Sequence, residues 1–198
     1  MRSLKIIVLG FMFFSLGISV ETSWAAAPED QSGFVLVAKF AQRKMEFFRV
    51  NAQSQELVHS YPIAVPKKSL KNPPAVGRLK EIWVNPPWWP TEKTKQDRLK
   101  KGIVLPDKVK PREANNAMGK IKFLIDWQGR TARVVRLHGT NEPKSIGQRI
   151  TRNCVRLRNE DAFNLAGFIL GEPEIFLANL KNSRIFKVQK EIVVRLEN

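Results

Sequence analysis

Short runs of apolar and β-branched residues, separated by Gly, Pro, Asn and Asp, recur along most of this chain and limit what it can fold into. Such spacing is typical of strands joined by turns. We expect the runs at 34–40 and 45–50 to pair as a hairpin. The runs at 121–125 and 132–137 should pair around a turn at 126–130, where Gly129 suits the tight geometry. The other expected strands are 57–65, with Pro62 and Pro66 favouring a sheet edge, 79–84, which follows a Pro-rich basic loop at 67–77, 184–188 and 192–196.

One segment near the end of the chain has a clear helical pattern. Asn159 is a good N-cap, and two acidic residues follow it in the first turn. Apolar residues then recur with helical spacing until Gly171, at Ala162, Ala166, Ile169 and Leu170. Shorter helices are expected within 91–101 and 174–180. The sequence therefore predicts a mostly β (α+β) fold with one main helix after Cys154.

The first 25 residues have the pattern of a cleaved export signal. Arg2 and Lys5 precede an apolar run at 6–20, and the small residues around Ala25 allow cleavage after it. The run is shorter than the roughly 20 apolar residues of a membrane span, and an uncleaved anchor is the alternative. We therefore expect residues 26–198 to form a single periplasmic domain with no integral membrane span after cleavage.

The charge of the chain indicates an anionic partner. Lys and Arg number 34 against 18 Asp and Glu, so the net charge is +16, and +15 would remain after loss of the signal. A protein this basic attracts polyanions. Export and the dispersed placement of the basic residues disfavour nucleic acid, so we expect the anionic cell wall. A merely solvated basic surface is the alternative.

Residues 85–111 combine five prolines, many lysines and the pair Trp88 and Trp89. An irregular stretch of this length inside a domain is usually functional, and we expect it to leave the sheet and overhang a cleft. The two tryptophans could line that cleft or stack on sugar rings. Packing into the core is the alternative, because Trp is highly buried on average.

Cys154 is the single cysteine, so the chain cannot form an internal disulfide. In an exported protein this indicates a reactive thiol or an intermolecular pair, and a buried inert thiol is the alternative. His138 ends a predicted strand one loop earlier, where it could take the thiol proton. If the chain around Cys154 is extended, Arg152 and Arg156 share its face and should favour the thiolate. His59 lies in an alternating strand and is expected to pack or face solvent.

Two motifs carry a family resemblance. His138-Gly139-Thr140 and 151–156, Thr-Arg-Asn-Cys-Val-Arg, are similar to the His-Gly-Thr and Ser-x-Gly-Cys-(Ile/Val)-Arg motif of the YkuD-type L,D-transpeptidases. The segments at 74–77, 85–88 and 116–120 also resemble this family, so that the resemblance covers about 33–170. Asn153 departs from the family glycine. Asn is the best replacement if that position needs a positive φ, and it adds bulk if the position needs close approach of substrate.

The resemblance implies a β-sandwich or barrel-like catalytic domain that acts on peptidoglycan without a cofactor or metal. Cys154 would attack the carbonyl between the third and fourth residues of a tetrapeptide stem and form an acyl-enzyme. An amine would then resolve it into a cross-link, a lipoprotein attachment or an exchanged D-amino acid. His138 would shuttle protons, and the carbonyl of Gly139 would orient it. The backbone N–H groups of Asn153 and Cys154, with Arg152, would form the oxyanion hole. The candidate substrate-binding residues are Thr140, Thr151, Arg156, Trp88 and Trp89.

Two other functions stay open. A cysteine hydrolase, either an L,D-carboxypeptidase or an amidase, would use the same groups with water as acceptor. A catalytically silent wall-binding protein would use the basic charge and the aromatic loop, and it would need neither His138 nor Cys154.

Overall fold

The computed structural model describes residues 33–69, 75–128 and 135–198. The expected export signal at 1–25 lies outside the described residues, as does the first half (132–134) of the strand expected at 132–137. No helix within the described ranges is both long and apolar enough to cross a membrane.

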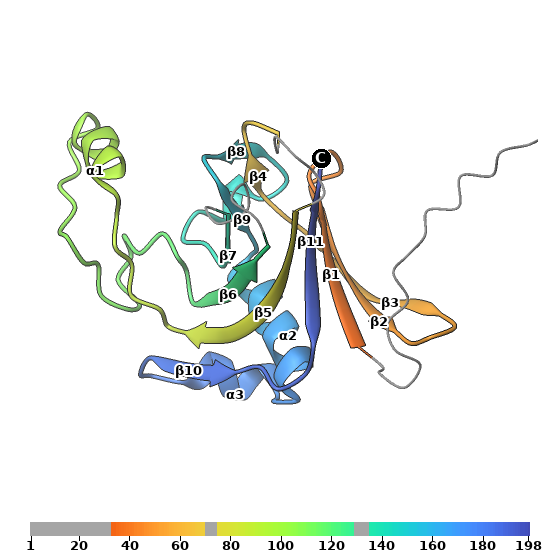
Figure 1. The fold of residues 1–198 in the computed structure, drawn as a ribbon. Coiled ribbons are helices and arrows are strands. Elements are labelled where there is room, and N and C mark those ends of the chain that lie inside the picture. The colour runs from red at the N-terminus through yellow and green to blue at the C-terminus, as the bar shows by residue number, and fades with distance from the viewer. Residues whose placement is uncertain (1–32, 70–74, 129–134) are drawn as a thin grey trace, which may run out of the picture.

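A curved nine-stranded sheet forms the body of the molecule (Figure 1). Its strands follow the order β3-β2-β1-β11-β5-β6-β7-β9, and β10 pairs with the later part of β5. A separate two-stranded sheet joins β4 to β8. The bounds are β1 Gly33–Lys39, β2 Lys44–Val50, β3 Gln55–Pro62, β4 Val65–Pro66, β5 Ala75–Val84, β6 Ile121–Trp127, β7 Arg136–His138, β8 Arg149–Thr151, β9 Cys154–Arg156, β10 Arg184–Lys187 and β11 Ile192–Glu197.

The hairpin expected from the first two apolar runs is confirmed as the antiparallel pair β1 and β2. The expected edge position of the third run is also confirmed, because β3 ends the sheet order and closes at Pro62. The last strand, β11, lies between β1 and β5, parallel to β1 and antiparallel to β5. Its alternate residues Ile192, Val194 and Leu196 are buried.

β5 is longer than expected, because residues 75–78 belong to the strand and not to the preceding loop. Gly77 suggested a loop, but here it pairs with Trp127 of β6. A Cβ at Gly77 would lie 2.6 Å from the Trp127 ring and 2.7 Å from Ile125. The glycine therefore serves the close approach of two strands, which is the other common reason for Gly inside a strand.

The main helix is α2, Asn159–Leu170, with Gly171 in the left-handed conformation at its C-cap. It packs Phe163, Leu165 and Ile169 into the same core as the sheet. Three smaller helices are α1 (Glu92–Leu99), η1 (Pro143–Ser145) and α3 (Glu174–Asn179). The mostly β fold with one main helix after Cys154 is thus confirmed.

The expected N-cap of α2 is wrong by one residue. Arg158 occupies the N-cap position and makes no capping hydrogen bond through its side chain. Asn159 instead links two other segments, since its Oδ1 accepts from the backbone N–H of Lys120 at 2.9 Å and its Nδ2 donates to the carbonyl of Thr140 at 2.9 Å. The side chain therefore holds the His138-Gly139-Thr140 motif against the start of β6.

Residues 85–120 leave the sheet after β5, carry α1, and return at β6; we call this segment the excursion (Figure 1). Its own small core consists of Trp88, Leu105, Val109 and Met118. Buried Asn116 ties its two ends together, because Nδ2 donates to the carbonyls of Pro86 at 2.8 Å and Lys110 at 3.1 Å. The helix α1 itself has no buried residue.

Candidate active site

The parallel pairing of β7 with β9 brings the His and Cys motifs together. Cα of Arg136 lies opposite Cys154, and Cα of His138 lies opposite Arg156. The residues between them in each strand, Leu137 and Val155, are buried in the main core. Because side chains alternate along a strand, the other four residues share the opposite face of the sheet. His138 and Cys154 are therefore diagonal neighbours on adjacent strands, one strand apart in the sheet and two residues apart along it, a separation that longer side chains can span.

His138 is only 1% exposed and is held in one orientation. Its Nδ1 lies 2.5 Å from the carbonyl oxygen of Gly139, a contact that requires Nδ1 to carry the proton. Nε2 is then an acceptor, and it is buried close to the backbone of Met118 without a hydrogen bond of normal geometry among the described residues. Burial, reinforced by the nearby Arg156 and Arg136, lowers the pKa of His138 to about 3. The resting imidazole is therefore neutral.

The thiol of Cys154 is also neutral at rest. Burial raises its pKa, and the positive charges of Arg156 and Arg136 and the backbone of Asn153 offset this only in part. The expectation that Arg156 favours the thiolate agrees with the direction of its effect, since it lowers the pKa of Cys154, but burial outweighs it. The guanidinium of Arg152 instead pairs with Asp97.

Arg152 connects the nucleophile segment to the excursion. Its guanidinium forms an ion pair with Asp97 of α1 and donates to the hydroxyl of Thr94 at 3.2 Å. The side chain thus joins α1 to the residue two positions before Cys154. Its positive charge is already paired, so the oxyanion role predicted for position 152 would have to come from the backbone.

A second connection runs through Glu142, which the sequence patterns did not single out. One carboxylate oxygen of Glu142 lies 2.7 Å from Arg98 of α1, and the other lies 2.9 Å from Arg156 of β9. These two arginines lower the pKa of Glu142 although burial opposes them. Arg156, a candidate for holding a substrate carboxylate, is therefore occupied by a carboxylate of the protein itself.

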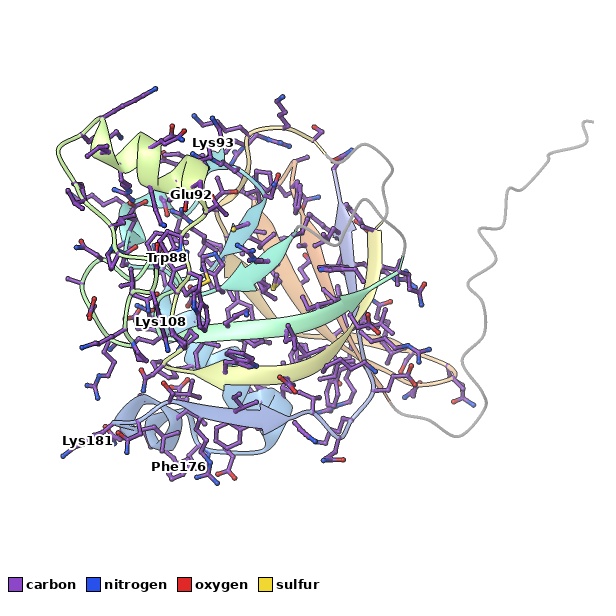
Figure 2. The ribbon with its side chains drawn as sticks, turned by 60° about the vertical axis from the view of Figure 1, so that its left-hand side comes forward. Trp88, Glu92, Lys93, Lys108, Phe176 and Lys181 are labelled. Atoms are coloured by element: carbon purple, nitrogen blue, oxygen red, sulfur yellow. The ribbon has the colours of Figure 1, made fainter. Side chains whose placement is uncertain are left out.

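A cavity of about 780 Å³ lies between this sheet edge and the excursion. Among the predicted residues it is lined by Cys154, His138, Asn153, Arg152, Thr151, Arg156 and Trp88. Figure 2 shows Trp88 and Lys108 in the loops of the excursion, with Glu92 and Lys93 on α1. The expectation that 85–111 overhangs a cleft agrees with this arrangement, since α1 contributes Lys93, Thr94, Asp97 and Arg98 to the cavity wall.

Three predicted residues do not line the cavity. The carbonyl of Gly139 accepts a hydrogen bond from Nδ1 of His138. Thr140 is buried, and its hydroxyl accepts from the N–H of Glu142 at 3.0 Å. Trp89 is 52% exposed, and the ammonium of Lys108 lies 5.4 Å from its ring centre.

Trp88 and Trp89 therefore differ in burial and in their relation to the cavity. Trp88 is 7% exposed, belongs to the small core of the excursion and still lines the cavity. Thr151 is buried at the cavity wall and donates from its hydroxyl to the carbonyl of Cys154 at 2.5 Å. This bond fixes the backbone of the nucleophile, which gives Thr151 a structural contact whatever it does with substrate.

Asn153 does not need the conformational freedom of glycine. The non-glycine residues with positive φ in the described part of the chain are Arg43, Asn85 and Arg112, and Asn153 is not one of them. Its side chain lines the cavity next to Cys154. A positive φ therefore does not account for this position, and the Asn153 side chain adds bulk to the cavity beside Cys154.

Sequence patterns missed Arg136, Glu142 and Met118, which all line the cavity. Arg136 could have been found, because it stands two positions before His138 in an extended segment and must share its face. Glu142 could not, because its partners come from two distant segments. Within the described residues, no group of three or more His, Cys, Asp and Glu is placed to hold a metal ion.

Comparison with known proteins places these motifs in a family. The model of the L,D-transpeptidase catalytic domain, YkuD, matches residues 32–190. The Probable L,D-transpeptidase ErfK/SrfK of Salmonella typhimurium is 29% identical over 130 residues, which are 64% of this chain and 38% of that protein. The Probable L,D-transpeptidase YcfS of Escherichia coli is 29% identical over 166 residues, which are 83% of this chain and 48% of that one. The chain thus spans less than half the length of these relatives.

Solved structures give weaker similarities. The helical cell shape determining protein Pgp2 from Campylobacter jejuni aligns with a TM-score of 0.46 at 15% identity, covering 85% of this chain and 49% of that one. L,D-transpeptidase 3 from Mycobacterium tuberculosis, in complex with a faropenem-derived adduct, aligns with a TM-score of 0.44 at 14% identity, covering 84% and 61%. The family model, in contrast, spans most of the chain and contains both the His138 and the Cys154 motifs. On that match, this chain belongs to the family of L,D-transpeptidase catalytic domains.

Proposed function

We propose that this protein is a cysteine-dependent L,D-transpeptidase that acts on peptidoglycan tetrapeptide stems. One observation carries the proposal beyond family membership. Buried Nε2 of His138 is an acceptor without a hydrogen bond of normal geometry among the described residues, and Cys154 lies on the neighbouring strand and the same face of the sheet. A base oriented by a third group beside a nucleophile is the arrangement that nucleophilic catalysis requires.

The chemistry starts from a neutral pair. Nε2 of His138 takes the thiol proton as the sulfur attacks the carbonyl between the third and fourth residues of the stem. The proton then passes from the imidazolium to the departing amine of the fourth residue, and a thioester remains on Cys154. An acceptor amine gives a proton to Nε2, attacks the thioester and restores the thiol. Backbone N–H groups at 153 and 154 are the proposed donors to the oxyanion.

The neutral resting state has a use in this scheme. A buried thiolate and imidazolium without substrate would be costly, and a free thiolate would be open to oxidation. The low pKa of His138 means that its positive charge exists only while the tetrahedral intermediate carries a negative one. We further propose that the protein works in the periplasm after removal of residues 1–25, and that a lipoprotein is one possible class of acceptor.

The test is mass spectrometry of muropeptides after incubation of the protein, without residues 1–25, with tetrapeptide-containing peptidoglycan. We expect loss of the terminal D-amino acid and formation of cross-linked or exchanged products, together with a protein mass increased by the acyl group. Cys154→Ala should abolish both, and His138→Gln should slow acylation by about 10²-fold or more. The exposed histidine variant His59→Gln is the matched control and should behave as the wild type.

Other outcomes would change the function. Release of tripeptides without new cross-links or exchange would identify a hydrolase, because water then resolves the thioester. Binding to peptidoglycan with no change in muropeptides across several wall types would contradict catalysis. In that case Asn153→Gly is the decisive variant, since it removes the bulk beside Cys154.

A further inference from the structure

In the described part of the chain, Arg136 is the cavity arginine that has no carboxylate partner. Among the described residues, Arg98 and Arg156 pair with Glu142, and Arg152 pairs with Asp97. No ion pair within the same ranges involves Arg136, which is exposed at the cavity wall. Lys67, Lys93 and Lys101 also line this cavity, so cations outnumber the two acidic residues there.

The position of Arg136 relates it directly to the reacting groups. Its Cα pairs in register with that of Cys154, and it stands two residues before His138 on the same strand face. Its charge reaches both groups, because it lowers the pKa of His138 and the pKa of Cys154. A guanidinium one strand away from the thiol can reach a group that lies one residue from the attacked carbonyl.

We propose that Arg136 is a specificity-determining residue that binds a carboxylate of the acyl donor. This inference rests on the proposed function. A donor cleaved before its last residue carries a free C-terminal carboxylate one residue from the scissile carbonyl, and a second carboxylate is present if the third residue is acidic. Arg is suited to either, because its planar fork binds carboxylates with two parallel hydrogen bonds. Arg156 cannot do this without losing Glu142.

Binding of a donor carboxylate would also activate the base. Arg136 is one of the charges that disfavour imidazolium at position 138. A carboxylate that neutralises it makes protonation of Nε2 easier when the donor is in place. The protein would thus distinguish a free-acid donor from a neutral one twice, in binding and in the first proton transfer.

The experiment measures acylation of Cys154 by intact-mass kinetics with three donors. These are a tetrapeptide with an acidic third residue, its C-terminal amide, and its analogue with the third-residue side chain amidated. We expect the wild type to lose about 10- to 100-fold in kcat/KM on one of the amides, the range for a lost charge-assisted hydrogen bond. Arg136→Ala should lose a similar factor on the free acid and show no further loss on that amide.

The two carboxylates have different kinetic signatures. The C-terminal carboxylate leaves with the fourth residue, so its recognition affects acylation alone. A third-residue carboxylate stays on the thioester, so Arg136→Ala would also change the rate at which an amine resolves it. Arg136→Lys should recover part of the loss, because it keeps the charge but not the fork.

Two controls separate this inference from the proposed function. Arg78→Ala removes an exposed arginine that pairs with Glu191 away from the cavity, and it should keep the wild-type preference. Calorimetry with Cys154→Ala measures binding of the same three peptides without turnover, so it tests Arg136 even if no acylation is found. The inference would be overturned if Arg136→Ala preferred the free acid over the amides as strongly as the protein with Arg136 does, in kinetics or in binding. It would also be overturned if Cys154→Ala with Arg136 intact bound the free acid and both amides equally well.

Discussion

The catalytic strands and the excursion are held by different forces, although they face each other across one cavity. His138 and Cys154 stand on β7 and β9, whose intervening residues lie in the large core that α2 and the sheet share. The excursion has four buried apolar residues of its own, and its helix α1 has none. What joins α1 to the sheet is polar, namely Arg152 with Asp97 and Glu142 with Arg98 and Arg156.

This difference means that the stability of the catalytic strands and the access to the cavity depend on different interactions. Apolar burial contributes most of the free energy of folding, so the nucleophile and base are as rigid as the domain itself. Partly exposed ion pairs contribute little and weaken with salt. The wall formed by α1 can therefore be loosened without unfolding the strands that carry the chemistry. Four predictions test this contrast, in order of decreasing effect.

The largest effect should come from a leucine of the main core. Leu137→Ala leaves a cavity between the strands of the site and should lower the free energy of global unfolding by about 2–5 kcal/mol in a urea titration. Leu105→Ala makes the same chemical change in the small core of the excursion. It should lower global stability less and increase hydrogen exchange within the excursion. Equal global losses would mean that the two cores unfold as one.

Acid should destabilise the catalytic region through His138. Because the folded-state pKa is about 3 and the unfolded one is about 6.5, the folded protein binds fewer protons in this interval. The free energy of unfolding therefore keeps the full contribution of neutral His138 above pH 6.5. It falls by up to about 1.4 kcal/mol per pH unit as the pH drops toward 3. Urea titrations of His138→Gln should show a shallower loss between pH 6.5 and 4.5. A slope in His138→Gln equal to that of the wild type would contradict the burial argument.

The ends of the excursion should open when Asn116 is replaced. Asn116→Ala leaves the carbonyls of Pro86 and Lys110 without their donor and costs about 1–3 kcal/mol. Hydrogen exchange should rise within 86–110 and stay unchanged in β7. Asn141→Ala is the milder control, because that exposed amide makes a single bond to the carbonyl of Ala114 at 2.7 Å. Loss of protection in β7 would show that the excursion supports the catalytic strands.

The smallest change in stability should come from the ion pair on α1. Asp97→Asn breaks the contact with Arg152, and since both side chains are about half exposed the cost should be below about 1 kcal/mol. Alkylation of Cys154 by iodoacetamide should nevertheless become several-fold faster, and salt should produce part of this increase in the wild type. Glu92→Gln removes a pair that lies within the excursion's own helix and should leave the alkylation rate as it is. An unchanged rate in Asp97→Asn would mean that α1 does not limit access.

Much of the fold follows from local patterns. The hairpin β1–β2, the strands β6 and β11, and α2 ending at Gly171 were all expected, because alternation and helical spacing are properties of short segments. The short strands β8 and β9 were not recognised as separate elements. They pair in parallel with β4 and β7, and three residues show too little alternation to indicate a strand.

The site residues that could be predicted are those that belong to recognisable sequence motifs. Cys154 and His138 come from the sequence, and the structure sets them on adjacent strands of one face. The partners of the arginines were not predictable, because Asp97 and Glu142 are ordinary surface acids in the sequence and acquire their roles only when α1 folds back. For the same reason Arg156 looked available for substrate, and Arg136 was overlooked.

The central place of β11 has a consequence for how the protein is made. This strand lies between β1, the first strand described, and β5, so within the described part of the large sheet it alone pairs β3-β2-β1 with β5-β6-β7-β9. Ribosomes deliver β11 after all the other described strands. Until then the two halves expose apolar edges that cannot pair correctly. The complete sheet, and with it the finished catalytic cavity, can therefore form only after residues 192–197 have been synthesised.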